Sequence, residues 1–176
     1  MSRWVLFALS LASAVPAGAD SSLSGKAIKI LDGDTLIIVT AQGDRQARVR
    51  LAQIDAPETS QAFGQRSKQS LSDLVYGKGV QVAVEKTDQY GRLIGVVHVD
   101  NLDANLEQVK RGMAWVYPQY AKDPSYFAAE RTARDAKTGL WAQSDPTSPW
   151  KFRHSAKPSS VIIKPGAEYE DELGGN

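Results

Sequence analysis

Short stretches in which apolar, often β-branched residues alternate with polar ones fill much of the first hundred positions. They cover residues 27–31, 35–40, 46–52, 80–84 and 93–99. Such stretches predict β-strands, because successive side chains of a strand point to opposite faces. Turn-forming pairs, Asp32-Gly33 and Gly43-Asp44, separate the first three stretches and predict tight connections between them.

Three other stretches have the wider apolar spacing of helices, at residues 62–76, 104–111 and 125–137. Glycines follow each of them, and Gly112 and Gly139 are suited to cap the last two. The first helix lies between the third and fourth strands, and the other two follow the fifth. We therefore predict an α+β fold, in which a five-stranded Greek-key β-barrel of the OB type carries three helices.

The two ends of the chain differ from this domain. Arg3 precedes an apolar run at residues 4–15, and Ala17 and Ala19 have the spacing of a signal-peptide cleavage site. We expect residues 1–19 to be a signal peptide and the mature protein to be periplasmic or secreted, with no membrane attachment. An uncleaved anchor or a buried first helix is the alternative. Residues 20–153 then form the domain, and residues 154–176, which lack periodicity and are mostly acidic in charge, a flexible tail.

The composition limits the possible chemistry. The chain has no cysteine and two histidines, so disulfides, cysteine zinc sites and thiol nucleophiles are excluded. Residues 20–153 hold 18 basic and 16 acidic residues. This balance is far from that of a protein that binds nucleic acid by charge alone. A polyanionic substrate would need positive charge concentrated at the site, or a metal ion.

Two acidic clusters are candidates for a metal site. Asp32 and Asp34 flank Gly33, an arrangement that forms a simple hairpin turn or presents two carboxylates to one cation. Asp55 and Glu58 flank a turn at the end of the third strand, where a loop on a rigid scaffold often carries function. Either cluster alone would be explained by a surface turn. Together they offer the oxygen ligands that a hard cation such as Ca²⁺ prefers.

Two arginines could supply the positive charge. Arg92 follows a tight turn next to Tyr90, and Arg50 begins the segment that leads to Asp55. An exposed hairpin with an ordinary surface arginine would also explain the first of them. Both guanidinium groups could nevertheless grip a phosphate, because their planar donors match its oxygens in pairs.

Three strings, in this order and spacing, resemble the thermonuclease (staphylococcal nuclease) family. They are ILDGDT at residues 30–35, RLAQIDAPE at 50–58 and TDQYGR at 87–92. The helix that carries Asn105, Arg111 and Gly112 and the closing GLW at 139–141 are similar as well. The resemblance covers about residues 24–141. It implies an SNase-like barrel and a Ca²⁺-dependent nuclease that cuts DNA and RNA with little sequence preference and leaves 3′-phosphate ends.

The resemblance also implies a role for each residue of the site. Asp34 and Asp55, with the carbonyl of Ala56, would hold Ca²⁺. Asp32 would contact these ligands and not the ion itself. Glu58 would orient or deprotonate the attacking water, while Arg50 and Arg92 would bind the scissile phosphate. Tyr90 and Tyr117 would lie against the nucleotide. DNA and RNA would be the only partners, and the protein would act as a monomer.

Two other classes of function fit the predicted fold. A noncatalytic OB module would bind single-stranded nucleic acid or a protein, and would not need Glu58, Arg50 or Arg92. A periplasmic calcium-binding domain with a structural role would leave the two arginines unexplained. Cleavage of DNA by the purified protein separates the nuclease from both.

Overall fold

The computed structural model describes residues 22–43 and 45–155, and confirms the predicted α+β barrel fold. The predicted signal peptide at 1–19 lies outside the described residues, as does all but the start of the predicted tail at 154–176. In the described part of the chain, no helix has the length and apolar character to cross a membrane.

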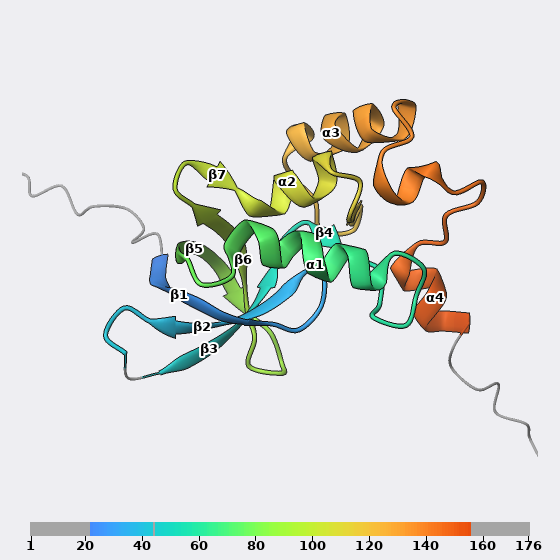
Figure 1. Ribbon diagram of the computed structural model, residues 1–176. Helices are drawn as coiled ribbons and strands as arrows, with labels where there is room; N and C mark the ends of the chain where they lie inside the picture. Colours follow the sequence, from blue (N-terminus) through green and yellow to red (C-terminus); the bar gives the residue numbers. More distant parts are fainter. Residues whose placement is uncertain (1–21, 44, 156–176) are drawn as a thin grey trace, which may run out of the picture.

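The barrel consists of five strands, drawn in blue to green in Figure 1. These are β1 (Ser22–Ile30), β2 (Thr35–Thr40), β3 (Gln46–Leu51), β5 (Gly79–Thr87) and β6 (Leu93–Val99). Four antiparallel contacts run in the order β3-β2-β1-β5-β6, and a parallel pairing of β3 with β6 closes the barrel. All five strands overlap the alternating stretches of the sequence, although β1 begins five residues earlier and β5 ends three residues later than predicted.

The alternation places one set of apolar side chains inside the barrel. Leu36 and Ile38 of β2, Val49 of β3, Val82 of β5 and Val97 of β6 are fully buried. They belong to one core cluster that also includes residues of the first two helices. Burial of such side chains, at roughly 1.5–3 kcal/mol each, is the main force that fixes the strand register.

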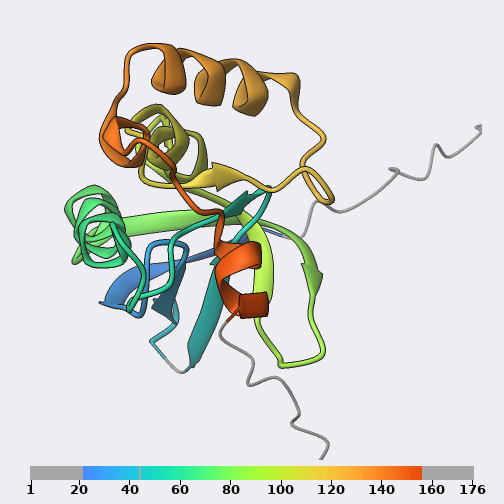
Figure 2. The same cartoon turned by 90° about the vertical axis from the view of Figure 1, so that its right-hand side faces the viewer.

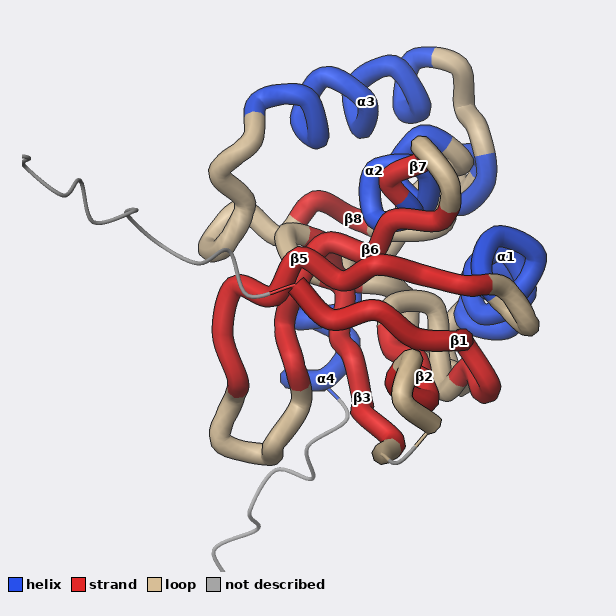
Figure 3. The backbone as a smooth tube through the Cα atoms, turned by 90° about the vertical axis from the view of Figure 1, so that its left-hand side faces the viewer, coloured by secondary structure: helices blue, strands red, loops and turns tan. Residues whose placement is uncertain are grey.

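The three predicted helices lie outside the barrel, where Figure 3 draws them in blue. They are α1 (Gly64–Val75), α2 (Ala104–Lys110) and α3 (Pro124–Asp135), all within two residues of the predicted bounds. Asp103 and Asp123 cap α2 and α3 by accepting hydrogen bonds from main-chain N–H groups of the first turn. Pro124 occupies the start of α3, where its missing N–H costs nothing.

The structure also contains elements that the sequence did not predict. Three strands of two residues, β4 (Ile54–Asp55), β7 (Leu102–Asp103) and β8 (Trp115–Val116), extend the barrel or pair with each other. A 3₁₀ turn, η1 (Gly139–Ala142), precedes a fourth helix, α4 (Pro149–Ser155). In Figure 2, α4 lies against the barrel, well away from α2 and α3. The boundary expected at residue 153 therefore falls inside a helix.

Gly139 is not the cap of α3, contrary to the prediction. The left-handed residue that ends this helix is Lys137, with φ of 51°. The N–H of Thr138 then reaches the carbonyl of Ala133, which completes a Schellman-type end. Gly139 is needed for a different reason, because a Cβ there would lie 2.3 Å from the carbonyl oxygen of Gly112.

A buried polar network ties α2 to the loops that border the barrel. Asn105 accepts a hydrogen bond from the N–H of Val97 and donates to the carbonyls of Ala52 and Gly95, at 3.0–3.1 Å. Gln108 donates to the carbonyl of Gly33 at 2.8 Å. Burial makes each unpaired polar group costly, so these bonds hold the loops in one arrangement.

Candidate active site

A pocket with a volume of about 950 Å³, here the hollow, lies beside one end of the barrel. Its walls come from the loop before β2, the end of β3, the β5–β6 turn and α4. Nearly all the residues singled out from the sequence line it: Asp32, Asp34, Arg50, Ala56, Glu58, Tyr90, Arg92 and Tyr117. Asp55 has no exposed surface and lies behind this wall.

Arg50 joins the two carboxylates that were predicted to hold a cation. Its guanidinium donates to Asp34 Oδ1 at 2.6 Å and to Asp55 Oδ1 at 2.8 Å. Although burial by itself lowers the pKa of Arg50, the charges of Asp34 and Asp55 raise it above its usual value. The arginine is therefore a permanent cation between two buried carboxylates.

Two further contacts fix the orientation of Asp34. The N–H of Ala56 donates to its Oδ2 at 2.9 Å, and the hydroxyl of Thr35 donates to its Oδ1 at 2.9 Å. The preceding turn must approach α1 closely, because a Cβ on Gly33 would lie 1.8 Å from the hydroxyl oxygen of Ser67. Glycine at this position therefore lets the loop carry Asp34 up to Ala56.

Asp32 supports Asp34 from the preceding side of the turn. Its Oδ1 accepts a hydrogen bond from the main-chain N–H of Asp34 at 3.0 Å. Burial, together with the charge of Asp34, raises the pKa of Asp32 to about 6. Burial also raises the pKa of Asp55, against the opposing effect of Arg153. The site thus gathers more carboxylate charge than a buried environment favours.

The donor chemistry of this cluster fits a hard divalent cation. Among the described residues, no group of three or more His, Asp or Glu side chains is arranged to hold a metal. The protein ligands would be two carboxylates, from Asp34 and Asp55, and the carbonyl of Ala56, with water filling the remaining positions. Oxygen ligands of this kind suit Ca²⁺ or Mg²⁺. A nearby cation would also offset the repulsion that raises the pKa of Asp32.

Arg92 is held by the turn that precedes it. Asp88 Oδ1 accepts hydrogen bonds from the N–H groups of Tyr90 and Arg92, and its Oδ2 pairs with Arg92 Nε at 2.7 Å. Gly91 has a φ of 75°, which the turn requires. The guanidinium carbon of Arg92 lies 5.6 Å from the centre of the Tyr90 ring, and Tyr90 itself is 73% exposed. The turn therefore presents a positioned cation beside an exposed aromatic ring.

Glu58 has a partner that the sequence did not predict. Arg153 of α4 donates to Glu58 Oε1 at 2.8 Å and binds both carboxylate oxygens of Asp55, at 2.8 and 3.2 Å. The carboxylates of Asp55 and Glu58 raise the pKa of Arg153 above its usual value. Asp55 is thus bound by two arginines, one from β3 and one from α4.

Tyr117 lines the hollow but is already in contact with other aromatic rings. It stacks on Trp150 of α4, with ring centres 5.4 Å apart and planes 4° apart, and it meets Tyr120 edge to face at 4.9 Å. Trp150 also meets Trp115 edge to face at 5.6 Å. These contacts place an aromatic wall beside the carboxylates and fasten α4 to it.

Arg153 and Trp150 were missed because their region lacks apolar periodicity. One local signal was present, since Ser148-Pro149 is typical of a helix start. The contact of Arg153 with Asp55 depends on how the chain returns to the barrel, which no local pattern shows.

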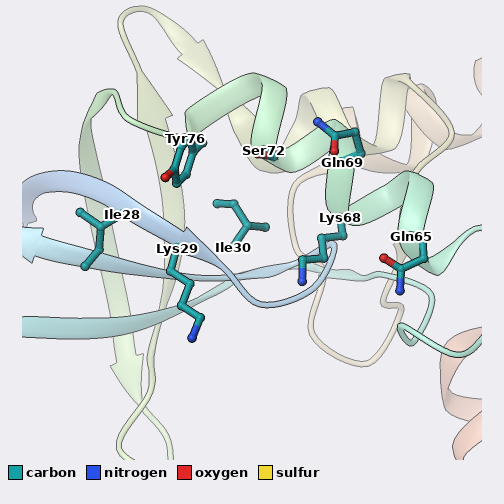
Figure 4. A pocket seen from close by; sticks show the side chains of 8 residues that line it. All are labelled: Ile28, Lys29, Ile30, Gln65, Lys68, Gln69, Ser72 and Tyr76. Atoms are coloured by element: carbon teal, nitrogen blue, oxygen red, sulfur yellow. The ribbon is translucent and has the colours of Figure 1, made fainter.

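A smaller hollow of about 330 Å³ lies elsewhere, between β1 and α1 (Figure 4). Lys29 and Lys68 are among its lining residues, with Gln65, Gln69 and Tyr76. It contains none of the carboxylates described above, so it offers no comparable catalytic set.

Comparisons with known proteins agree with the geometry. The family model described as "Staphylococcal nuclease homologue" matches residues 48–143. This match includes Arg50, Asp55, Glu58 and Arg92, but neither Asp34 nor α4.

Curated relatives match over most of the chain. An "Uncharacterized endonuclease" of Haemophilus influenzae is 46% identical over 150 residues, which cover 80% of this chain and 84% of the relative. A "Micrococcal nuclease" of Shigella flexneri is 41% identical over 167 residues, which cover 88% of this chain and 93% of the relative. "Protein ParB" of Escherichia coli is 39% identical over 158 residues, which cover 83% of this chain and 86% of the relative.

Proposed function

Because the chain belongs to the family of staphylococcal nuclease homologues, we propose that it is a divalent-cation-dependent nuclease. Its substrates would be DNA and RNA, its cation Ca²⁺, and its products strands with 3′-phosphate ends. The observation that carries this proposal is the arrangement of Arg50 between Asp34 and Asp55, beside Glu58 and in one hollow with Arg92. The names of the relatives support the same class of activity.

The chemistry follows from the charge of the substrate. A phosphodiester resists attack because its oxygens are negative, and more charge gathers on them in the transition state. A cation held by Asp34, Asp55 and the Ala56 carbonyl would supply positive charge there. Arg92, positioned by Asp88, would bind phosphate oxygens through its planar donors. Preorganised charge of this kind is worth roughly 10²–10³ in rate for a single donor.

Glu58 is suited to be the general base. Its side chain lines the hollow and is 38% exposed, whereas Asp34 and Asp55 are buried and would hold the cation. Glu58 would accept a proton from water as the water oxygen bonds to phosphorus. The bond from phosphorus to the 5′ oxygen would then break, and the leaving oxygen would take a proton from solvent water to become a hydroxyl. A positioned base contributes about 10²–10⁴ in rate.

The hollow gives no basis for strict sequence preference. Its most exposed aromatic residue, Tyr90, offers a ring on which any base can stack. Arg92 and the cation would act on the phosphate, which is the same at every step of a strand. We therefore infer broad substrate use.

A direct test uses purified protein on circular and linear DNA and on RNA, each with Ca²⁺, Mg²⁺ or a chelator. Cleavage with Ca²⁺ and its loss with chelator are expected. The product ends are read by extension with a DNA polymerase, which a 3′-phosphate blocks until a phosphatase removes it. Binding of single strands without cleavage would favour a noncatalytic module and contradict the proposal.

We also infer that the protein is exported after removal of residues 1–19, on the strength of the apolar run and the Ala17 and Ala19 spacing. Mass spectrometry of the exported protein should then find Asp20 at the N-terminus. Exported protein that retains Met1 would contradict this inference.

A further inference from the structure

We propose that Arg153 is a positioning residue of the nuclease reaction, which holds the Glu58 carboxylate in place relative to Asp55. The inference rests on the proposed function and adds α4 to the working site. It starts from one contact, in which a single guanidinium binds Glu58 Oε1 and both oxygens of Asp55.

Glu58 needs such a partner. Its side chain is 38% exposed and lies in a loop that follows Pro57. Within the part of the chain that the structure describes, Arg153 is the one side chain seen bonded to the Glu58 carboxylate. A carboxylate that must meet a water molecule in one orientation loses rate when it samples others, since small misplacements of catalytic groups are costly.

Arg153 is itself well placed to set that orientation. Trp150, one turn earlier on α4, packs on Tyr117 and Trp115. Gln61 adds a second link between this loop and the start of α4. Its side chain accepts a hydrogen bond from the N–H of Glu58 at 3.2 Å and donates one to the carbonyl of Thr147 at 2.6 Å. The loop of Glu58 and the start of α4 are therefore joined at two points.

Arg50 and Arg153 each hold a different pair of carboxylates. Arg50 fixes Asp34 relative to Asp55, and Arg153 fixes Glu58 relative to Asp55. Asp55 is fully buried and common to both pairs. The proposed cation ligands and the proposed base thus share one rigid frame, of which α4 is a part.

The test is a set of variants in the full chain, with rates and Ca²⁺ affinity measured side by side. Arg153→Met keeps an unbranched apolar stem similar to that of arginine and removes the guanidinium. We expect kcat to fall by roughly tenfold to a hundredfold, which reaches at most the lower end of the roughly 10²–10⁴ that a positioned base contributes, with little change in KM. Ca²⁺ affinity from calorimetry should not weaken, because Arg50 still holds both aspartates and one positive charge has gone. A general loss of structure would weaken both.

Two further variants identify the group through which Arg153 acts. In Arg153→Lys the charge stays but one ammonium cannot match the fork of donors, so kcat should recover in part. In the double variant with Glu58→Gln, kcat should equal that of Glu58→Gln alone, because no base is left to position. Lys151→Met removes a charge from an exposed position of the same helix and should match the wild type.

Three results would overturn the inference. An unchanged kcat in Arg153→Met would show that Glu58 needs no such partner. A raised kcat with tighter Ca²⁺ binding would make Arg153 a competitor of the cation. Losses that multiply in the double variant would show that Arg153 acts independently of Glu58. If the Met variant does not fold, Arg153→Lys and its double variant decide. A wild type that does not cut nucleic acid contradicts the proposed function itself.

Discussion

The guanidinium of Arg153 binds both carboxylate oxygens of Asp55, although the two residues are 98 positions apart in the chain. Asp55 is fully buried at the end of β4, and Arg153 lies in the last helix of the described structure. A buried carboxylate is costly without a partner. The pair therefore makes the end of the domain part of the site, and it sets the point at which the chain can be shortened.

A deletion that begins after α4 should leave activity unchanged, whereas a deletion that includes α4 should reduce it. Deletion of residues 156–176 removes none of the site residues, so we expect specific activity to stay within a factor of two or so. Deletion of residues 148–176 removes Trp150 and Arg153 and uncovers Asp55 and Tyr117. Activity should then fall by at least tenfold, and the thermal midpoint should drop. Equal activities of the two truncated proteins would contradict the role of α4.

Lysine should not replace either arginine of the phosphate site. Arg50→Lys and Arg92→Lys keep the charge but lose the planar fork, which pairs with two oxygens at once. We expect each to reduce kcat/KM by about 10² or more, the scale of one preorganised donor. Arg111→Lys is the matched control, because Arg111 also forms an ion pair within its own segment, with Glu107, but outside the hollow. Rates near the wild type in a folded Arg92→Lys protein would show that charge alone suffices there.

Asp32 should make the stability of the cation-free protein depend on pH. Burial and the charge of Asp34 raise its pKa from 3.8 to about 6 in the folded state. The folded protein therefore binds more protons than the unfolded chain between these values. The contribution of protonated Asp32 to the free energy of unfolding is fully present below about pH 4 and is lost as the pH rises through about 6.

Asp32→Asn removes this dependence, because the amide stays neutral and can still accept the N–H of Asp34. Between pH 4 and pH 7, the free energy of unfolding of the variant should rise by about 1–3 kcal/mol relative to that of the wild type. Denaturant unfolding in the presence of a chelator at both pH values measures this gain. Parallel pH profiles of the two proteins would show that Asp32 titrates normally in the fold.

The barrel could be predicted because its signals are local. The alternation in β2 and β6 marks faces that are buried whatever the rest of the chain does, and Gly112 ends its helix by backbone geometry alone. The site residues up to Arg92 came from motifs, and the structure brings them into one hollow, except for Asp55, which lies behind its wall. That Arg50 bridges Asp34 and Asp55 could not be seen, since the contact depends on the pairing of β2 with β3.

The end of the domain could not be predicted for a different reason. The seven residues of α4 are too few to show a helical period, and they are stabilised by contacts of Trp150 and Arg153 with distant parts of the chain. Likewise, the end of α3 at Lys137 depends on a left-handed lysine, where a glycine two residues later was the obvious candidate. Tertiary contacts decided the first case, as they often do for short elements, and the local Schellman-type end decided the second.

In the proposed mechanism, Asp55 binds the cation and Glu58 accepts a proton from the attacking water. Calorimetric Ca²⁺ titration alongside cleavage rates of Asp55→Asn and Glu58→Gln tests it most directly. Asp55→Asn replaces a charged ligand with a neutral one, so Ca²⁺ binding should weaken and high Ca²⁺ should restore part of the activity. Glu58→Gln should bind Ca²⁺ almost normally, lose roughly 10² or more in turnover, and gain nothing from added Ca²⁺. If Glu58→Gln loses Ca²⁺ binding as badly as Asp55→Asn, Glu58 is chiefly a ligand and the account of the base is wrong.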